Sequence, residues 1–178
     1  MNKFSIATIA GISILSAAAS VNALADQSSI AVNGVYIGAG ATGVVGIINS
    51  GTSVDPGATI TLGYRVNNNF AVESNVTAFV EAFASGQIID LNMKGILPVT
   101  SKFSVFGKLG AACFHAKDDF DFLGFSDHSS VTRFAPEVGG GVSYNFTPNF
   151  ATELGASVVP VSGLTIVPVT LGMRYTFG

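Results

Sequence analysis

The chain ends in Thr170-Leu171-Gly172-Met173-Arg174-Tyr175-Thr176-Phe177, followed by one glycine. As a β-strand, this stretch places its large apolar residues on one face and its small, polar or charged residues on the other, because successive side chains point to opposite sides. Such a strand suits the wall of a membrane barrel, which separates lipid from a wet interior. The stretch therefore predicts one strand of a barrel wall.

Eight segments read as strands separated by turn residues, and the last of them contains the stretch quoted above. They are residues 34–45, 58–66, 70–83, 87–99, 102–116, 132–146, 150–159 and 165–177. Eight is the smallest number of strands in a bacterial membrane barrel, so the pattern predicts an all-β, eight-stranded antiparallel transmembrane β-barrel. Tight turns at 67–69, 100–101 and 147–149 fall on the side of both termini, which we assign to the periplasm. The polar stretches 46–57 and 117–131 are expected to be longer external loops.

Charge and aromatic residues follow the same alternation. Apolar side chains keep one phase in each strand, whereas every charge within a strand takes the other, and only residues 34–45 are too uniform to assign. A Lys or Arg facing lipid would cost about 2–4 kcal/mol at mid-membrane, so a bilayer imposes this separation. The apolar phase also holds aromatic residues beside the tight turns and the C-terminus, as expected for a ring at the membrane interface. They are Tyr64, Phe70, Phe103, Tyr144, Phe146, Phe150, Tyr175 and Phe177.

The first residues predict export. A basic start at Lys3, an apolar stretch over residues 4–19 and Ala23-Leu24-Ala25 form a signal peptide with cleavage after Ala25. The expected organisation is a signal peptide over residues 1–25 and an outer-membrane barrel domain over 26–178. A retained signal anchor is the alternative for the first segment. The one cysteine, Cys113, excludes an internal disulfide.

Composition excludes several classes of protein. The mean hydropathy is +0.54 and only 11% of residues are charged, yet no apolar run after the signal approaches the roughly 20 residues of a membrane helix. A soluble β-barrel with an apolar core remains the alternative that periodicity alone does not separate, although export, hydropathy and the aromatic ring favour the membrane. The net charge of −3 argues against nucleic acid as a partner. No cofactor and no metal site are predicted.

Three stretches resemble the small Gram-negative outer-membrane barrels of the OmpA transmembrane-domain and opacity type, which are also labelled surface antigens or porin-family proteins. Residues 139–150 look like their strand, tight turn and strand unit, and residues 102–110 resemble another recurrent strand. The ending Thr170-x-Gly172-x-x-Tyr175-x-Phe177 is similar to the assembly signal that these barrels present to the outer-membrane insertion machinery. The resemblance implies an outer-membrane location, contact with lipid and with that machinery, and external loops that meet a host or environmental ligand.

The polar phase predicts a network of charges inside the barrel. Four positive and four negative residues share an interior barely wide enough for side chains, so we expect them to pair. They are Arg65, Lys94, Lys108 and Arg174 with Glu73, Asp90, Glu137 and Glu153. A static plug is the favoured interpretation. A gate whose pairs switch to open a narrow ion path is the alternative.

Two further candidates lie in and beside the second external loop. Asp118, Asp119, Asp121 and Asp127 offer oxygen ligands for a divalent cation, although their spacing matches no calcium loop and a solvated acidic loop is favoured. His128 and Ser130, with Glu137, resemble the His-x-Ser and Glu of outer-membrane lipid A deacylases. The chain departs from that family at Val131, where the family has Asn, and in the short distance from Ser130 to Glu137. We therefore predict a structural or surface-interaction barrel and no enzyme.

Overall fold

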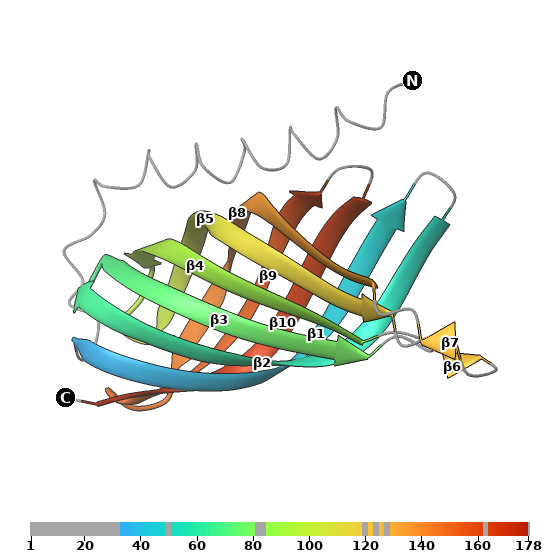
Figure 1. Ribbon diagram of the computed structural model, residues 1–178. Coiled ribbons are helices and arrows are strands. Elements are labelled where there is room, and N and C mark those ends of the chain that lie inside the picture. Colours follow the sequence, from blue (N-terminus) through green and yellow to red (C-terminus); the bar gives the residue numbers. More distant parts are fainter. Residues whose placement is uncertain are drawn as a thin grey trace, which may run out of the picture.

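The structure is a computed structural model that describes residues 33–48, 51–80, 85–118, 121–122, 125–126, 129–161 and 164–177. The predicted signal peptide lies outside these residues. The strands are β1 (Gly34–Ile48), β2 (Gly51–Asn67), β3 (Phe70–Val80), β4 (Ser85–Pro98), β5 (Phe103–Asp118), β6 (Asp121–Phe122), β7 (Phe125–Ser126), β8 (Ser129–Asn145), β9 (Phe150–Val161) and β10 (Leu164–Thr176). Figure 1 shows the short β6–β7 pair beyond one end of the barrel. No helix in the described ranges is long and apolar enough to cross a membrane.

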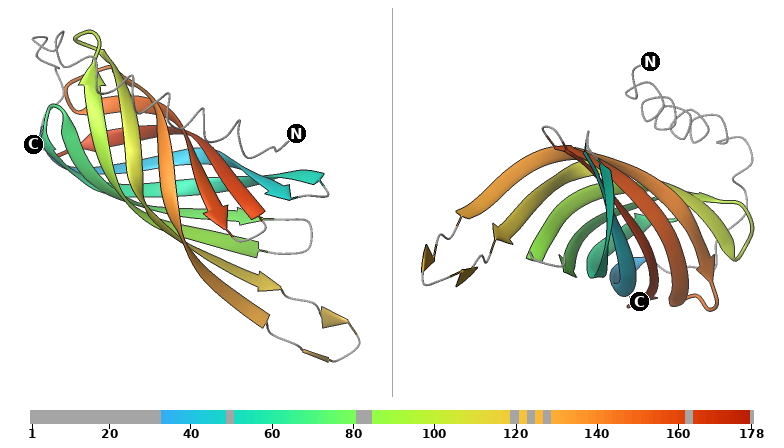
Figure 2. Two further views of the ribbon diagram at one scale, coloured as in Figure 1. Left: turned by 90° about the horizontal axis from the view of Figure 1, so that it is seen from above. Right: turned by 90° about the vertical axis from the view of Figure 1, so that its right-hand side faces the viewer.

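The longer strands form a closed antiparallel barrel in the order β1-β10-β9-β8-β5-β4-β3-β2. Closure depends on the pairing of β1 with β10, which runs from Tyr36 opposite Thr176 to Ile47 opposite Thr165. The two views of Figure 2 show the tilted strands curving around one interior. This architecture confirms the eight-stranded barrel that the sequence predicts.

Two of the tight turns repeat one local motif, Thr-x-x-Phe. In the β4–β5 turn, Thr100 Oγ1 accepts the Phe103 N–H at 2.9 Å, and in the β8–β9 turn Thr147 Oγ1 accepts the Phe150 N–H at 3.0 Å. In the β2–β3 turn, Asn67 Oδ1 accepts the Asn69 N–H at 2.8 Å. These side chains satisfy backbone donors where the ladder ends, and so fix the register of the strands on either side.

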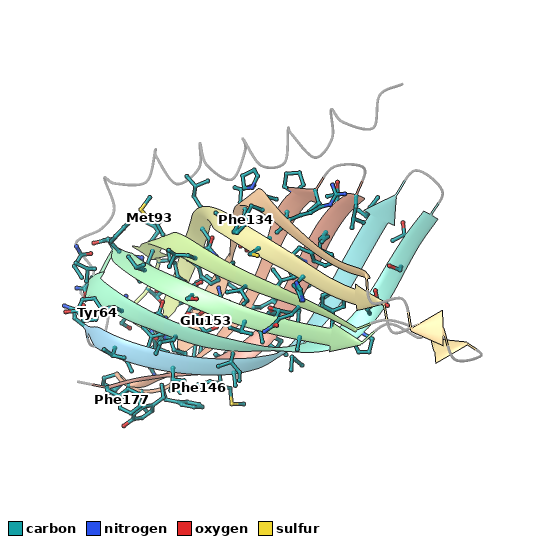
Figure 3. All side chains as sticks on the ribbon, viewed as in Figure 1. Tyr64, Met93, Phe134, Phe146, Glu153 and Phe177 are labelled. Atoms are coloured by element: carbon teal, nitrogen blue, oxygen red, sulfur yellow. The ribbon has the colours of Figure 1, made fainter. Side chains whose placement is uncertain are left out.

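The outer wall is apolar in the phase that the alternation predicts. Figure 3 shows Tyr64, Met93 and Phe134 pointing away from the barrel, while Glu153 lies within it. On β10, Leu171 points outward and is 59% exposed, whereas Arg174 points inward and is 5% exposed. Beside the turns, neighbouring aromatic rings stack edge to face, with centroids 5.0 Å apart for Tyr175 and Phe177. An exposed apolar band of this kind belongs in lipid.

The prediction of a loop over residues 46–57 is wrong. β1 continues to Ile48 and β2 begins at Gly51, so Gly46 lies opposite Ser53 within a paired ribbon of the two strands. The segment is polar and rich in glycine, which indicated a loop, but a two-stranded ribbon beyond the membrane needs no apolar face. The loop predicted over 117–131 is likewise shorter, because β5 runs to Asp118 and β8 starts at Ser129.

The pairing of β8 with β9 covers only part of β8. β8 and β9 pair only from Val138–Val158 to Asn145–Ala151, so the described part of β8 between Ser129 and Glu137 is bonded to β5 alone. Prolines lie at this level on each of the three neighbouring strands, at Pro136, Pro160 and Pro168. We refer to this break as the β8–β9 seam. Figure 2 shows β5 and β8 extending together past the other strands toward β6 and β7.

The outward face can be tested with one charge placed at two depths. Leu171→Arg puts a cation at the middle of β10 on the lipid side, where the change should cost about 2–4 kcal/mol, and barrel assembly should fail. Val99→Arg places the same charge in the exposed β4–β5 turn and should assemble like the unchanged chain. The shift in gel mobility between unheated and heated samples measures assembly. Equal assembly of both variants would contradict the assignment of the lipid face.

Candidate functional site: the barrel interior

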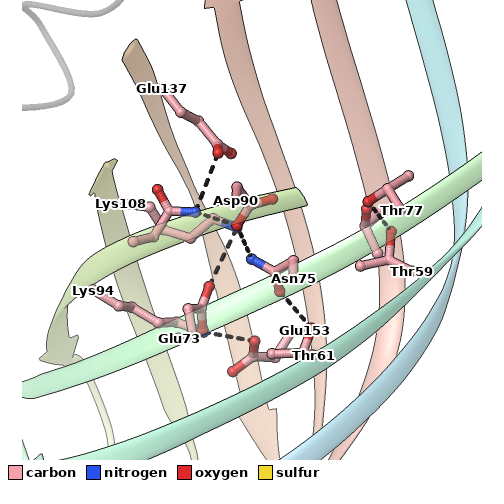
Figure 4. A network of polar contacts seen from close by, with 12 residues as sticks. Thr59, Thr61, Glu73, Asn75, Thr77, Asp90, Lys94, Lys108, Glu137 and Glu153 are labelled. Carbon is pink, nitrogen blue, oxygen red and sulfur yellow. Dashed lines mark hydrogen bonds and ion pairs between the residues drawn. The ribbon is translucent and has the colours of Figure 1, made fainter. Parts of the chain in front are cut away.

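Five charged side chains meet across the interior and form what we call the ion-pair cluster: Glu73, Lys94, Lys108, Glu153 and Arg174. Lys94 Nζ lies 3.2 Å from Glu73 Oε2 and 2.7 Å from Glu153 Oε2. Lys108 Nζ lies 3.3 Å from Glu73 Oε1, and Arg174 Nη1 lies 2.6 Å from Glu153 Oε1. Each glutamate therefore faces two cations. Figure 4 labels both glutamates and the two lysines.

Aromatic rings support the cluster from below. Tyr36 Oη donates a hydrogen bond to Glu73 Oε2 at 2.9 Å, and Lys94 Nζ sits 4.0 Å from the centroid of the Phe106 ring. Both rings lie close to a glycine: a Cβ on Gly63 would collide with the Tyr36 ring, and one on Gly141 would meet Phe106 Cζ at 2.7 Å. These glycines therefore provide the space that lets large rings fit inside a narrow barrel.

The other three predicted charges are inside but make different bonds. Arg65 Nη2 donates to the Asn68 carbonyl oxygen at 2.9 Å, near the β2–β3 turn. Asp90 Oδ1 accepts hydrogen bonds from the amides of Asn75 and Asn92, each at 2.6 Å. Glu137 Oε2 accepts one from Asn92 Nδ2 at 3.2 Å. Amides and backbone carbonyls thus satisfy these charges within the described residues, where the sequence suggested only ion pairs.

A ladder of threonine hydroxyls lies above the cluster. Thr42 Oγ1 is 2.6 Å from Thr59 Oγ1 and 2.8 Å from Thr170 Oγ1, and Thr59 Oγ1 is 2.7 Å from Thr77 Oγ1. The ladder, the Asp90 and Glu137 group, and the ion-pair cluster border a polar cavity of about 70 Å³. A polar space of this size suits a few water molecules.

Several of these residues were missed by sequence reasoning. Tyr36 lies in the strand whose phase was not assignable, and Phe106 shares the polar phase although it is apolar. Asn75 and Asn92 follow the same inward alternation as the charges around them, and this phase was the available signal. Their hydrogen bonds depend on which strands face each other across the interior, which the order of residues does not state.

The acidic candidates are only partly within the described structure. Asp118 ends β5 and Asp121 begins β6, whereas Asp119 and Asp127 lie outside the described residues. Across the described ranges, no group of three His, Cys, Asp or Glu side chains is arranged to hold a metal ion.

The residues of the deacylase hypothesis are not seen together either. His128 lies outside the described residues, and Ser130 pairs with Lys117 on the β5–β8 ribbon. Glu137, by contrast, is 2% exposed inside the barrel.

The residues of the proposed assembly signal divide between the two faces of β10. Tyr175 is exposed on the outside, as is Phe177 just beyond the strand. Thr170 bonds Thr42 inside, and the Gly172 carbonyl accepts a hydrogen bond from Thr152 Oγ1 at 2.9 Å.

Removing Lys94 should destabilise the barrel strongly. Lys94→Met leaves Glu73 and Glu153 with one cation each in a buried setting, so we expect a loss of about 3–5 kcal/mol in the free energy of unfolding. Lys102, an exposed residue in the β4–β5 turn, provides the control. Lys102→Met should change the free energy of unfolding by less than about 0.5 kcal/mol. Adding Glu153→Gln to Lys94→Met should recover part of the loss. Urea unfolding in lipid vesicles measures all three, and equal values for Lys94→Met and Lys102→Met would contradict the expectation.

Comparisons with solved structures place this barrel among known ones. Ail, the attachment invasion locus protein of Yersinia pestis, is 18% identical with a TM-score of 0.66. The match covers 82% of this chain and 100% of the Ail chain. Neisserial surface protein A is 19% identical with a TM-score of 0.66, over 80% of this chain and 97% of that one. OprG from Pseudomonas aeruginosa is 12% identical with a TM-score of 0.56, over 84% and 99%. Such identities show a shared fold.

Family membership comes from the sequence itself. Comparison with curated protein sequences found no match. A family model described as the outer membrane protein beta-barrel domain matches residues 11–177, which is nearly the whole chain. The chain therefore belongs to the outer membrane protein β-barrel domain family and is a protein of the bacterial outer membrane.

Proposed function

We propose that this protein is a structural and surface-interaction barrel whose interior is closed to ions. The observation that carries the proposal is the position of Lys94. Its partners Glu73 and Glu153 come from β3 and β9, which are four places apart in the ring of eight strands and so face each other across the barrel. Lys94 joins them and is 1% exposed, so the ion-pair cluster crosses the interior and does not merely line it.

Conductance separates this role from the alternative of a gated channel. The refolded chain in a planar bilayer should be silent, because ions would have to displace fixed charges that already satisfy one another. The triple variant Glu73→Ala, Lys94→Ala, Glu153→Ala removes the crossing side chains without a net charge change larger than one, and should give steady openings. Glu137→Ala is a control that leaves the ion-pair cluster in place and should stay silent.

Reproducible openings of the unchanged chain would overturn the closed interior. If those openings also change with Glu73→Gln or Arg174→Gln, the ion-pair cluster acts as a gate, and the channel function replaces the one proposed.

The surface role is assigned to the ribbon of β5 and β8, which extends past the barrel (Figure 2). Ail has been solved in complex with the heparin analogue sucrose octasulfate. In this chain the sequence from 117 to 127 carries four aspartates, Asp118, Asp119, Asp121 and Asp127, and one lysine, Lys117. Acidic residues repel a sulfated polymer, so a partner with a basic surface is the better match.

This preference is open to a direct test. The protein in vesicles should be retained on immobilised polylysine at low salt and pass through immobilised heparin. Changing Asp118, Asp119, Asp121 and Asp127 together to Asn should lower retention on polylysine severalfold, because attraction between exposed charges is screened and roughly additive. Asp55→Asn, which removes one carboxylate from the β1–β2 ribbon, serves as the control. Retention on heparin would contradict the proposed partner.

The same proposal includes export and insertion. The leader is cleaved after Ala25, which N-terminal sequencing of the mature protein would show as a start at Asp26. Outward Tyr175 on the closing strand and Phe177 just beyond it supply the contact for the insertion machinery. No catalysis is assigned, since Glu137 lies inside the barrel. Loss of lipid hydrolysis in Ser130→Ala would show the opposite.

A further inference from the structure

The upper interior, near the loop end of the barrel, is apolar. Seven buried residues, one from each of seven strands, pack together there: Val44, Phe79, Ile88, Ala112, Ala135, Val159 and Ile166. Phe114, Val161 and Leu164 are partly buried and pack against them. The Phe79 and Phe114 rings stack with centroids 6.2 Å apart and planes inclined by 21°. All lie in the inward phase, on the opposite face from the lipid wall.

This region is not completely filled. A cavity of about 440 Å³ opens beside the cluster, lined by Val44, Phe79, Phe114, Leu164 and Ile166, with Thr52, Ser53 and Asp55 at its rim. We call this cavity the apolar cup. Thr52 and Ser53 are exposed on the β1–β2 ribbon, so the rim reaches the outer end of the barrel. Its walls offer an apolar molecule shape and contact, and its rim offers few polar partners.

The floor of the cup is polar. Thr42 is two residues below Val44 on β1, and Thr77 is two residues below Phe79 on β3, so the threonine ladder begins where the apolar lining ends. On β4, Asp90 follows Ile88 in the same way. Below this level lie the 70 Å³ cavity and the ion-pair cluster. An apolar molecule in the cup would have to break these hydrogen bonds to go further.

We propose that the apolar cup binds a small neutral apolar molecule, aromatic or aliphatic, that enters from the external end and is held there without passing through the barrel. A dry apolar cavity of about 150 Å³ already binds benzene, so this cup accommodates a molecule of about ten carbon atoms. Its volume falls in the range of small-molecule sites, roughly 300–1,000 Å³. Binding in the cup goes beyond the surface role and does not depend on whether the barrel conducts ions.

The chain contains no tryptophan, so a single introduced Trp reports on one position without background. Phe114→Trp places the reporter in the cup. Phe134→Trp is the matched control: Phe134 lies on the neighbouring strand opposite Cys113, at the same height, but points into lipid and is 81% exposed. Both variants are measured in lipid vesicles with 1-bromonaphthalene, a ten-carbon heavy-atom quencher. Quenching at Phe114→Trp should saturate, whereas quenching at Phe134→Trp should rise in proportion to the probe dissolved in the bilayer.

Two changes at Val44 then test whether the cup itself is the site. In the Phe114→Trp background, Val44→Phe fills the cavity and should raise the half-quenching concentration by roughly tenfold or more, as expected when a pocket loses the volume of a few carbons. Val44→Thr keeps the shape, adds a hydroxyl, and should raise it by a smaller factor. This second variant covers the case in which Val44→Phe does not assemble, as judged by heat-dependent gel mobility.

Proportional, unsaturated quenching at both Trp positions would overturn the proposal, because it would mean that the probe only dissolves in lipid. Saturation that neither Val44 variant shifts would overturn it as well, since the probe would then be bound elsewhere. A conducting barrel with unchanged saturation at Phe114→Trp would reject the closed interior while leaving the cup in place.

Discussion

A bilayer offers the backbone no water, so every N–H and C=O that crosses it must find a partner within the protein. The pairing of β1 with β10 meets this demand by turning a sheet with two open edges into a ring. Everything else in the molecule follows from that closure. The ring fixes which side chains face lipid and which face inward, and with eight strands it leaves an interior about as wide as the side chains that fill it.

The interior resolves that restriction in two ways along its length. Near the turns, charges and rings share the space: Lys94 lies over the Phe106 ring, and Gly141 on the neighbouring strand leaves room for the ring. Toward the loops, aliphatic and aromatic side chains take over, and the filling becomes incomplete. The threonine ladder is the boundary, where hydroxyls satisfy one another. One barrel thus contains a polar ion-pair cluster and an apolar cup.

Alternation in the sequence predicted the barrel, its outward face and the inward direction of its charges, because the period of two is imposed by lipid on one side only. It did not reveal the cup, since Val44, Phe79 and Ile166 are apolar in the inward phase and there the pattern has no contrast. Nor did it distinguish Asp90, which is held by two amides, from Glu73, which is held by cations. That distinction depends on distances across the interior. The pairing of residues 46–48 with residues 51–53 escaped prediction because beyond the membrane no periodicity is enforced.

The β8–β9 seam has a consequence for how the barrel opens. Hydrogen bonds around a closed ring normally break together, since freeing one strand exposes two edges. At the seam, β8 above Val138 is already bonded on one side only, and Pro136 has no N–H to leave unsatisfied. The ladder bonds of β8 there are those to β5, so the β5–β8 ribbon can fray from its tip down to the seam while the rest of the ring stays shut.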